Sequence, residues 1–373
     1  MFNTFGTIFR LTSFGESHGA GIGGVIDGCP AGLLLDEEFI QAELDKRKPG
    51  NAQAGLAGTT RKEADQVKFL SGVYEGRTTG TPLAFFVENS NQKSGDYAKL
   101  AETYRPGHAD RAYDEKYGFR DPRGGGRSSA RETVARVVGG AVAQLYLKKQ
   151  GINIVAYTEA LDGIYAKDFG DFSLETCEKR LFFAPNDEVI SHWQERIEEV
   201  RRELDTLGGV VSIEAHGVPA GLGEPVFQKL DAYLSYALMG VGAVKAVEIG
   251  AGTLAAVSRG SQNNDTMYYE GGKLCYMSNN AGGIEGGISN GQPILLKAYV
   301  KPIPSVAKEQ KTVSKQGENV NLSIGGRHDI CAIPRIVPVL KAMTAMTLMD
   351  MFLLQKRMDN HPMDNCMGKG NNF

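Results

Sequence analysis

Hydrophobic residues spaced three and four apart predict two helices in the first half of the chain. In residues 36–47, Asp36 can cap the N-terminus, and an apolar pair, Ile40 and Leu44, lies on one face. In residues 129–150, the opening letters SARE match a capping box, and a stripe of valine, alanine and leucine follows. Both segments are therefore predicted to pack one helical face against a core.

A third apolar stripe covers residues 190–207 and contains the single tryptophan, Trp193. Its apolar residues alternate three and four apart, which is typical of an amphipathic helix. We assign this face to the core or to a surface between subunits. We assign no chemistry to His192, which lies within the same segment.

Alternation of apolar and polar residues predicts a strand at 210–215. A glycine-containing hexapeptide, GVPAGL, follows at 217–222 and precedes a helical stretch at 230–239. The same order occurs earlier, where a strand ending at Ile26 runs into GCPAGL at 28–33 and then into the first predicted helix. This echo indicates an internal duplication whose two halves pack as one body.

The domain organisation follows from the absence of a break between the halves. With 42% hydrophobic residues in 373, the chain can form a substantial core, and no linker rich in proline or serine divides it. We expect residues 1–357 to form a single catalytic domain. Residues 358–373, rich in polar residues and glycine, are expected to form a flexible tail.

Composition narrows the function classes. The 41 basic and 44 acidic residues nearly cancel, so bulk charge does not suggest nucleic-acid binding. The 5 cysteines have no Cys-x-x-Cys spacing, which disfavours a disulfide framework and a zinc site, and we expect no metal. The N-terminus lacks a secretion signal, and no stretch approaches the roughly 20 apolar residues of a membrane span. We expect a cytoplasmic protein that binds no membrane.

Three glycine-rich segments each place a histidine beside acidic, hydroxyl or arginine residues: 15–19 (GESHG), 105–110 (RPGHAD) and 325–329 (GGRHD). Glycine lets the backbone approach a ligand closely, and histidine exchanges protons near neutral pH. Because the chain has only 6 histidines, we expect the three segments to converge on one site. The alternative for any one of them is a glycine-rich turn with a surface histidine.

Residues 123–129 (RGGGRSS) lead into the second predicted helix and predict an anion pocket. Backbone N–H groups, the positive end of the helix dipole, two hydroxyls and two guanidinium groups meet there; a simple glycine hinge is the alternative. A second glycine-rich run, at 278–291, suits a flat or phosphorylated cofactor. Neither run matches the dinucleotide-binding or phosphate-loop pattern, which disfavours a Rossmann fold and a nucleotide hydrolase.

Arginines near these segments suit a ligand that carries a phosphate and carboxylates. They are Arg47, Arg105, Arg127, Arg131 and Arg327. In such a field, His18 and His108 could protonate a leaving phosphate or an anionic cofactor, and Asp329 could accept a proton. For any single arginine, a surface salt bridge is the alternative interpretation.

The three histidine motifs occur in the order GESHG, RPGHAD and GGRHD, with the letters RSSARET between the second and the third. With these motifs the chain resembles the chorismate synthase family from about residue 5 to residue 357. The resemblance implies an α+β fold, a β-α-β sandwich of helices between antiparallel sheets with an internal pseudo-twofold duplication, and a homotetramer. The implied reaction is the anti-1,4-elimination of phosphate from 5-enolpyruvylshikimate 3-phosphate to give chorismate. It requires reduced FMN but produces no net redox change.

The resemblance also implies site residues. His18, His108 and Asp329 correspond to the family's catalytic residues. The residues that correspond to substrate contacts are Ser17, Arg47, Arg105 and Arg131, and Arg47 also lies where NADPH binding is assigned. The residues that correspond to FMN contacts are Arg127, Ser128, Ser129, Gly242, Ala243, Gly286, Lys301, Pro302, Ile303, Pro304, Ser305 and Arg327.

The sequence departs from the family pattern at several positions. The basic triplet at 46–48 is Lys-Arg-Lys rather than all arginine, and the loop at 51–60 lacks arginines that relatives place near the substrate. Lys341 stands where a glutamate is common.

No added domain for flavin reduction is present, so we expect reduced FMN from an external source, with NADPH as an indirect reductant. The alternatives are an NADPH-dependent flavin oxidoreductase and a non-enzymatic phosphometabolite-binding protein.

Overall fold

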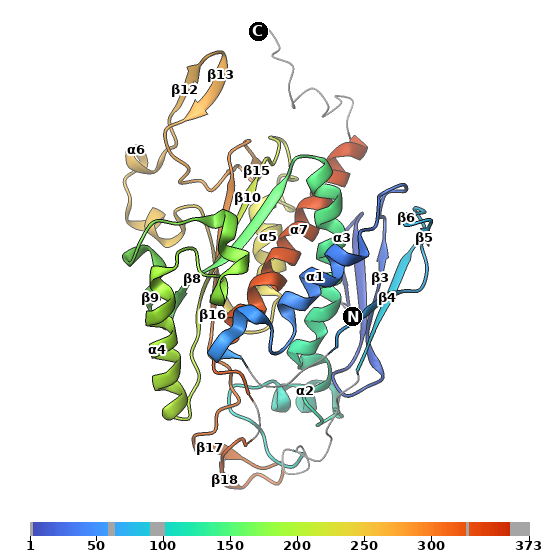
Figure 1. Ribbon diagram of the computed structural model, residues 1–373, viewed down its shortest axis with the longest axis vertical. Coiled ribbons are helices and arrows are strands. Elements are labelled where there is room, and N and C mark those ends of the chain that lie inside the picture. The colour runs from blue at the N-terminus through green and yellow to red at the C-terminus, as the bar shows by residue number, and fades with distance from the viewer. Residues whose placement is uncertain (1–2, 59–63, 90–100, 326–327, 359–373) are drawn as a thin grey trace.

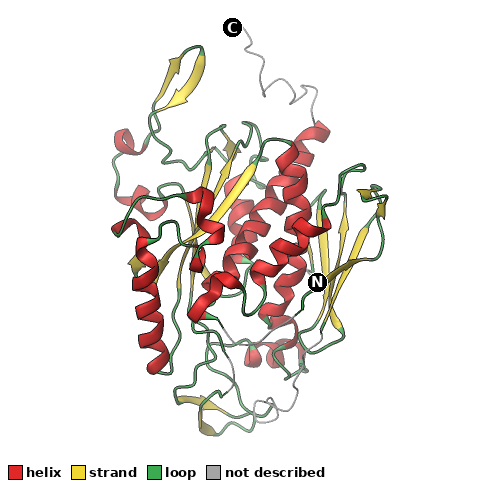
Figure 2. Ribbon diagram, in the orientation of Figure 1, coloured by secondary structure: helices red, strands yellow, loops and turns green. Residues whose placement is uncertain are grey.

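Two antiparallel sheets face each other across a layer of helices (Figures 1 and 2). The computed structural model describes residues 3–58, 64–89, 101–325 and 328–358. One sheet has the order β1 (Thr4–Phe5), β2 (Arg10–Gly15), β3 (Gly21–Asp27), β7 (Leu83–Glu88) and β4 (Val67–Phe69). The other has the order β11 (Val244–Ile249), β16 (Ile294–Val300), β10 (Gly209–His216), β8 (Asn153–Leu161) and β9 (Ile164–Tyr165). The α+β sandwich expected from the sequence is therefore confirmed.

The helices of the middle layer come from both halves of the chain. They are α1 (Glu37–Arg47), α3 (Thr133–Lys149), α5 (Leu230–Met239) and α7 (Ile333–Met358). The described residues also form α2 (Asp110–Tyr117), α4 (Glu188–Arg202) and α6 (Gly260–Asn263). Small two-stranded sheets complete the fold: β5 (Val73–Tyr74) with β6 (Arg77–Thr78), β12 (Met267–Glu270) with β13 (Lys273–Tyr276), β14 (Ile284–Glu285) with β15 (Ile288–Ser289), and β17 (Gln310–Val313) with β18 (Asn319–Leu322).

The two halves of the chain repeat one topology, as the hexapeptide echo predicts. In the first half the strands run β2-β3-β7-β4 across the sheet with α1 and α3, and in the second they run β8-β10-β16-β11 with α5 and α7. The Thr78 hydroxyl donates to the Pro30 carbonyl at 2.6 Å and accepts from the backbone N–H of Leu33. The Ser289 hydroxyl makes the same pair of bonds to Pro219 and Leu222. The internal duplication therefore extends to individual hydrogen bonds.

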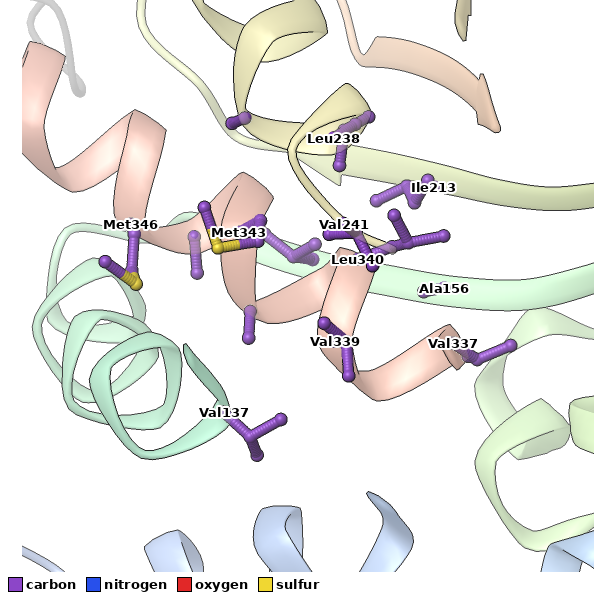
Figure 3. Close-up of a cluster of buried hydrophobic side chains, with 14 of the residues drawn as sticks. Val137, Ala156, Ile213, Leu238, Val241, Val337, Val339, Leu340, Met343 and Met346 are labelled. Carbon is purple, nitrogen blue, oxygen red and sulfur yellow. The ribbon is translucent and has the colours of Figure 1, made fainter. Parts of the chain in front are cut away.

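Helix α7 lies at the centre of the core, between α3 on one side and α5 with the second sheet on the other (Figure 3). Its apolar side chains join those of both halves in one buried cluster. Among the helices that the structure describes, α7 alone is long and apolar enough to cross a membrane, and its most apolar stretch is fully buried inside the protein. This helix was not predicted from the sequence, because Lys341 and Asp350 interrupt the apolar run. Burial identifies α7 as a core helix.

The predicted helices form, but two of their details are wrong. Asp36 caps α1 by accepting a hydrogen bond from the backbone N–H of Phe39 at 2.9 Å, as expected. At the predicted start at 129 the capping box does not form. The Ser129 hydroxyl instead accepts from the backbone N–H of Arg131 and caps a 3-10 turn at 130–132, the Glu132 carboxylate bonds Arg136, and α3 begins at Thr133. The four-residue spacing of Glu132 and Arg136 places both side chains on one face of the helix, where the ion pair engages the carboxylate. Helix α4 ends at Arg202, so the end of the 190–207 prediction lies outside it.

Lys341, the departure from the family pattern, lies in a buried charge cluster. Its ammonium contacts Glu178 Oε1 at 2.5 Å and Glu43 Oε2 at 3.4 Å, and Lys46 also contacts both carboxylates. Burial would raise the pKa of Glu178, but the charges and hydrogen bonds of Lys341 and Lys46 lower it to about 2. The stabilisation from this carboxylate is therefore present above its ordinary pKa and is lost as the pH falls towards 2. A lysine at 341 is compatible with the fold because two acids face it.

Candidate functional site

His18 lies in the tight turn between β2 and β3 and is only 7% exposed. Its ring nitrogen Nδ1 is 3.1 Å from the Ser17 hydroxyl, which in turn lies 3.4 Å from the Arg123 carbonyl oxygen. The neighbouring Ser17 and the 123–129 segment thus fix one edge of the imidazole. The turn is short because the register of β2 with β3 brings Gly15 opposite Ile22.

Two adjacent glycines bring the first and second histidine motifs together. A Cβ on Gly124 would lie 2.4 Å from Cε1 of His18, and a Cβ on Gly125 would lie 3.0 Å from Cε1 of His108. Both glycines have positive φ, +61° and +88°, which L side chains rarely adopt. The glycine run therefore packs directly against both imidazoles, and the predicted convergence of His18 with His108 is the geometry observed.

His108 is held by a carboxylate that sequence analysis did not assign. Its Nδ1 lies 2.9 Å from Oδ1 of Asp110, the first residue of α2. Arg105 binds the same carboxylate through Nε at 2.7 Å and Nη2 at 2.8 Å, and Arg120 lies 3.3 Å from Oδ1. This carboxylate and Arg105 Nη2, which lies 3.1 Å from the same ring nitrogen, orient the imidazole. The spacing of the RPGHAD motif, with the acid two residues after the histidine, was the available signal.

Asp110 is 2% exposed, yet it is held in its charged form. Burial would raise the pKa of this carboxyl, but the hydrogen bonds and charges of Arg105 and His108 outweigh burial and hold the pKa well below its usual range. Because the folded-state pKa is depressed, the contribution to stability is complete above the unfolded pKa of about 4. It is lost progressively as the pH falls from about 4 towards the lower folded-state pKa.

We expect Asp110→Asn to lower the free energy of unfolding at pH 7 by about 3–5 kcal/mol, because it leaves two buried guanidinium groups without their acceptor charge. Denaturant unfolding at pH 7 and at pH 3 measures this. At pH 3 the unfolded-state carboxyl is largely protonated while the native one stays charged, so part of the stability that this charge contributes is lost and the difference between variant and parent should shrink. An equal difference at both pH values would contradict the assignment of Asp110 as a charged partner.

The segments predicted to contact a cofactor lie partly beside these histidines. Arg127 donates to the Gly15 carbonyl at 3.1 Å and to the Ser13 hydroxyl at 2.7 Å, so it braces the start of the His18 turn. Lys301 donates through Nζ to the Gly107 carbonyl at 2.8 Å and through its backbone N–H to the Ala243 carbonyl at 3.0 Å. Burial and the nearby charge of Lys245 lower the pKa of Lys301. The predicted contacts at 242–243 and 301–305 thus adjoin the His108 segment.

One predicted cofactor contact, Gly286, is not brought to this place. Gly286 lies in the β14–β15 hairpin, beside the start of α5, and in Figure 1 β15 lies in the upper part of the body whereas α2 lies in the lower part. Within one chain, Gly286 is therefore remote from the histidines. Arg327 lies outside the described residues.

Arg131 and Arg47 share one buried carboxylate, that of Asp65. Arg131 binds Asp65 Oδ1, and Arg47 lies 3.3 Å from Oδ2. Arg47 is 1% exposed and also donates to Thr133 Oγ1 at 3.0 Å and to the Ala130 carbonyl at 2.9 Å. Its observed contacts support the segment that carries Arg131. Substrate contact by Arg47 stays a prediction.

Asp329 lies next to this arginine cluster. Its carboxylate binds Arg335 Nη1 at 2.5 Å, and Arg335 donates through Nε to the Arg47 carbonyl at 3.3 Å. Asp329 is buried in the segment just before α7, whereas the neighbouring His328 is half-buried, with Nε2 3.1 Å from the Gly325 carbonyl oxygen. In the third histidine motif, Asp329 rather than His328 contacts the buried arginine cluster.

Comparisons with known proteins agree on one family. A family model described as chorismate synthase matches residues 9–353. A protein named chorismate synthase from Maridesulfovibrio salexigens is 61% identical over 356 residues, covering 95% of this chain and 99% of that protein. One from Parabacteroides distasonis is 53% identical over 359 residues, covering 96% of this chain and 99% of that protein. A crystal structure of chorismate synthase matches with a TM-score of 0.75 at 32% identity and covers 94% of this chain and 93% of that one.

Proposed function

The chain belongs to the chorismate synthase family, and from that premise we propose how its residues carry out the reaction. The enzyme is a carbon–oxygen lyase that eliminates phosphate from 5-enolpyruvylshikimate 3-phosphate to give chorismate. The observation that carries our assignment of the site is the packing of His18 and His108 against the adjacent glycines 124 and 125. Two proton carriers and several guanidinium groups then surround one anionic ligand.

We propose that Arg105 and Arg131, with Ser17, bind the substrate. A molecule that carries a phosphate and two carboxylates needs several cations, and guanidinium groups bind such oxyanions in a fixed planar geometry. Asp110 and Asp65 hold these two arginines in place, so their orientation is set before the substrate arrives. Preorganised charges of this kind contribute most to an elimination in which an anion leaves.

The residues near the histidines fit FMN. Its phosphate needs cations, which Arg127 and Lys301 supply, and its flat ring needs close approach of the backbone. Gly242 offers such an approach, since no heavy atom lies within 4 Å of where its Cβ would be. We assign Arg127–Ser129, Gly242–Ala243 and Lys301–Ser305 to FMN. When bound, reduced FMN supplies transient electron density that helps phosphate leave without net redox change.

We assign proton transfer to the histidines and to Asp329. His108, with Asp110 behind Nδ1, can hold a proton on its imidazole and donate it to an oxyanion from the opposite ring nitrogen. His18, oriented by Ser17, is the second donor, and Asp329 accepts a proton as hydrogen is lost from the ring of the substrate. Arg335 Nη1 lies 2.5 Å from the Asp329 carboxylate and holds it in position.

We also propose a cytoplasmic homotetramer that receives reduced FMN from an external source, with NADPH as an indirect reductant. An exposed apolar arm supports assembly: Met267, Tyr269 and Leu274 on the β12–β13 hairpin are exposed, and the hairpin stands away from the body (Figure 1). Exposed apolar surface of this kind marks contact sites between proteins. The near balance of charge supports a ligand other than nucleic acid.

Anaerobic incubation with 5-enolpyruvylshikimate 3-phosphate and chemically reduced FMN tests this function. We expect equimolar chorismate and phosphate, with the flavin still reduced at the end and no NADPH consumed. Stoichiometric NADPH oxidation would favour a flavin oxidoreductase instead. Tight binding of both ligands without either product would favour a phosphometabolite-binding protein.

A further inference from the structure

Asn89, directly after β7, joins two parts of the proposed site that are far apart in sequence. Its side-chain Nδ2 donates to the carbonyl oxygens of Glu16 and Gly19, each at 2.9 Å. Its Oδ1 accepts from Nε of Arg131 at 2.9 Å, and its backbone N–H donates to the Ala20 carbonyl at 3.0 Å. One amide thus holds both ends of the turn that carries His18 and at the same time holds Arg131.

The chemistry of this position requires a carboxamide. Two carbonyl oxygens on one side need two N–H donors, and a guanidinium on the other side needs an acceptor. A short planar amide meets all three demands, whereas a carboxylate accepts from Arg131 but repels both carbonyls. The far side of Arg131 is fixed by Asp65, so the amide forms one link in a rigid chain from the Asp65 carboxylate to the His18 turn.

We propose that Asn89 is a positioning residue that sets the placement of His18, a proton carrier, relative to Arg131, a substrate-binding group. This inference rests on the proposed function of those two residues. Small displacements matter because a reacting group about 1 Å out of place can cost about 100-fold in rate. Binding tolerates such a displacement better than proton transfer does, since only proton transfer depends on the alignment of the transferring atoms.

Asn89→Asp tests this role, because it keeps the acceptor for Arg131 and removes both donors to the His18 turn. We expect kcat to fall by about 10–100-fold, with KM and the dissociation constant for 5-enolpyruvylshikimate 3-phosphate changing less than about 3-fold. The substitution also places a negative charge on the residue that holds both ends of the turn carrying His18. The limb of the kcat–pH profile that reports this histidine should therefore move to higher pH.

Asn186→Asp is the matched control. Asn186 makes the same pattern of bonds elsewhere, donating to the Ala166 and Gly170 carbonyls and accepting from the Val189 N–H, and it is 2% exposed. Its substitution should lower Tm like the Asn89 variant but leave kcat and its pH profile unchanged. Should Asn89→Asp fail to fold, Asn89→Gln keeps the amide but lengthens the side chain, and it should show the same selective loss of kcat.

The outcomes separate this inference from the function on which it rests. If the unmodified enzyme makes no chorismate, the proposed function fails. If it does, and Asn89→Asp lowers Tm with kcat and its pH profile unchanged, Asn89 is merely structural and the inference is overturned. A loss that appears mainly in KM would overturn it as well, because it would assign Asn89 to substrate binding through Arg131 alone.

Discussion

Replacement of Gly124 by alanine is expected to lower kcat by about 100-fold or more while reducing the free energy of unfolding by only about 1–2 kcal/mol. The added Cβ would lie 2.4 Å from Cε1 and 2.6 Å from Nδ1 of His18 and 2.9 Å from the Ser17 hydroxyl. Atoms cannot approach that closely, so the imidazole must move. The cost to folding is mainly that of a non-glycine residue at φ +61°.

Gly163→Ala is the control for the backbone strain. Gly163 has φ +81°, in the turn between β8 and β9, but no heavy atom lies within 4 Å of where its Cβ would be. We expect this variant to lose a similar amount of stability and to keep its kcat. Steady-state kinetics with reduced FMN and denaturant unfolding measure both quantities. Equal kcat values for the two variants would show that contact with His18 does not matter.

A double-mutant cycle tests whether the loss of kcat in Gly124→Ala arises from displacement of His18. If Gly124→Ala acts by displacing His18, it should cost little further activity in a His18→Ala background. His18→Ala alone is expected to lower kcat by about 100–10,000-fold, as removal of a positioned proton carrier does. Additive losses would place the effect of Gly124 elsewhere, for example on the backbone that approaches the flavin.

The largest expected effect on stability comes from Asp350, a fully buried carboxylate on α7. Three successive backbone N–H groups donate to it: Thr7 at 2.8 Å, Ile8 at 2.6 Å and Phe9 at 2.9 Å. The Tyr233 hydroxyl donates as well, at 3.0 Å, and burial together with the Asp350 charge raises the pKa of that phenol. The N-terminal segment is therefore fixed to the core by one side chain.

We expect Asp350→Ala to lower the free energy of unfolding by about 4 kcal/mol or more. Each buried donor left without a partner costs about 1–3 kcal/mol. Four donors lose theirs, one of them buried and three partly buried. Urea unfolding followed by far-UV circular dichroism measures the loss. Asp171→Ala, at an exposed position, is the control and should change stability by less than about 0.5 kcal/mol. A comparably small loss for Asp350→Ala would mean that water or a local shift replaces the missing acceptor.

Regular elements were predictable because their signals are local. The pattern at 230–239 gave helix α5 with the observed bounds, and the strand at 210–215 differs from β10 by one residue at each end. The duplication was visible in one short echo because both halves need the same glycine turn after a central strand. The end of α4 was predicted too late because apolar spacing continues past Arg202, while Leu204 turns outwards with φ +60°.

The sequence by itself determined which residue types the site contains: histidines, arginines and glycines in three short motifs whose order resembles one family. Only the tertiary structure decided which of them meet. It set Gly124 and Gly125 against the two imidazoles, Asp110 behind His108, and Asn89 between the His18 turn and Arg131. The sequence near Asn89 contains no signal for its role, because its hydrogen-bond partners are distant in sequence: Arg131 is 42 positions away, and Gly19 and Glu16 are 70 or more. Periodicity reports the faces that a segment buries, whereas hydrogen bonds between distant segments exist only once packing has placed those segments side by side.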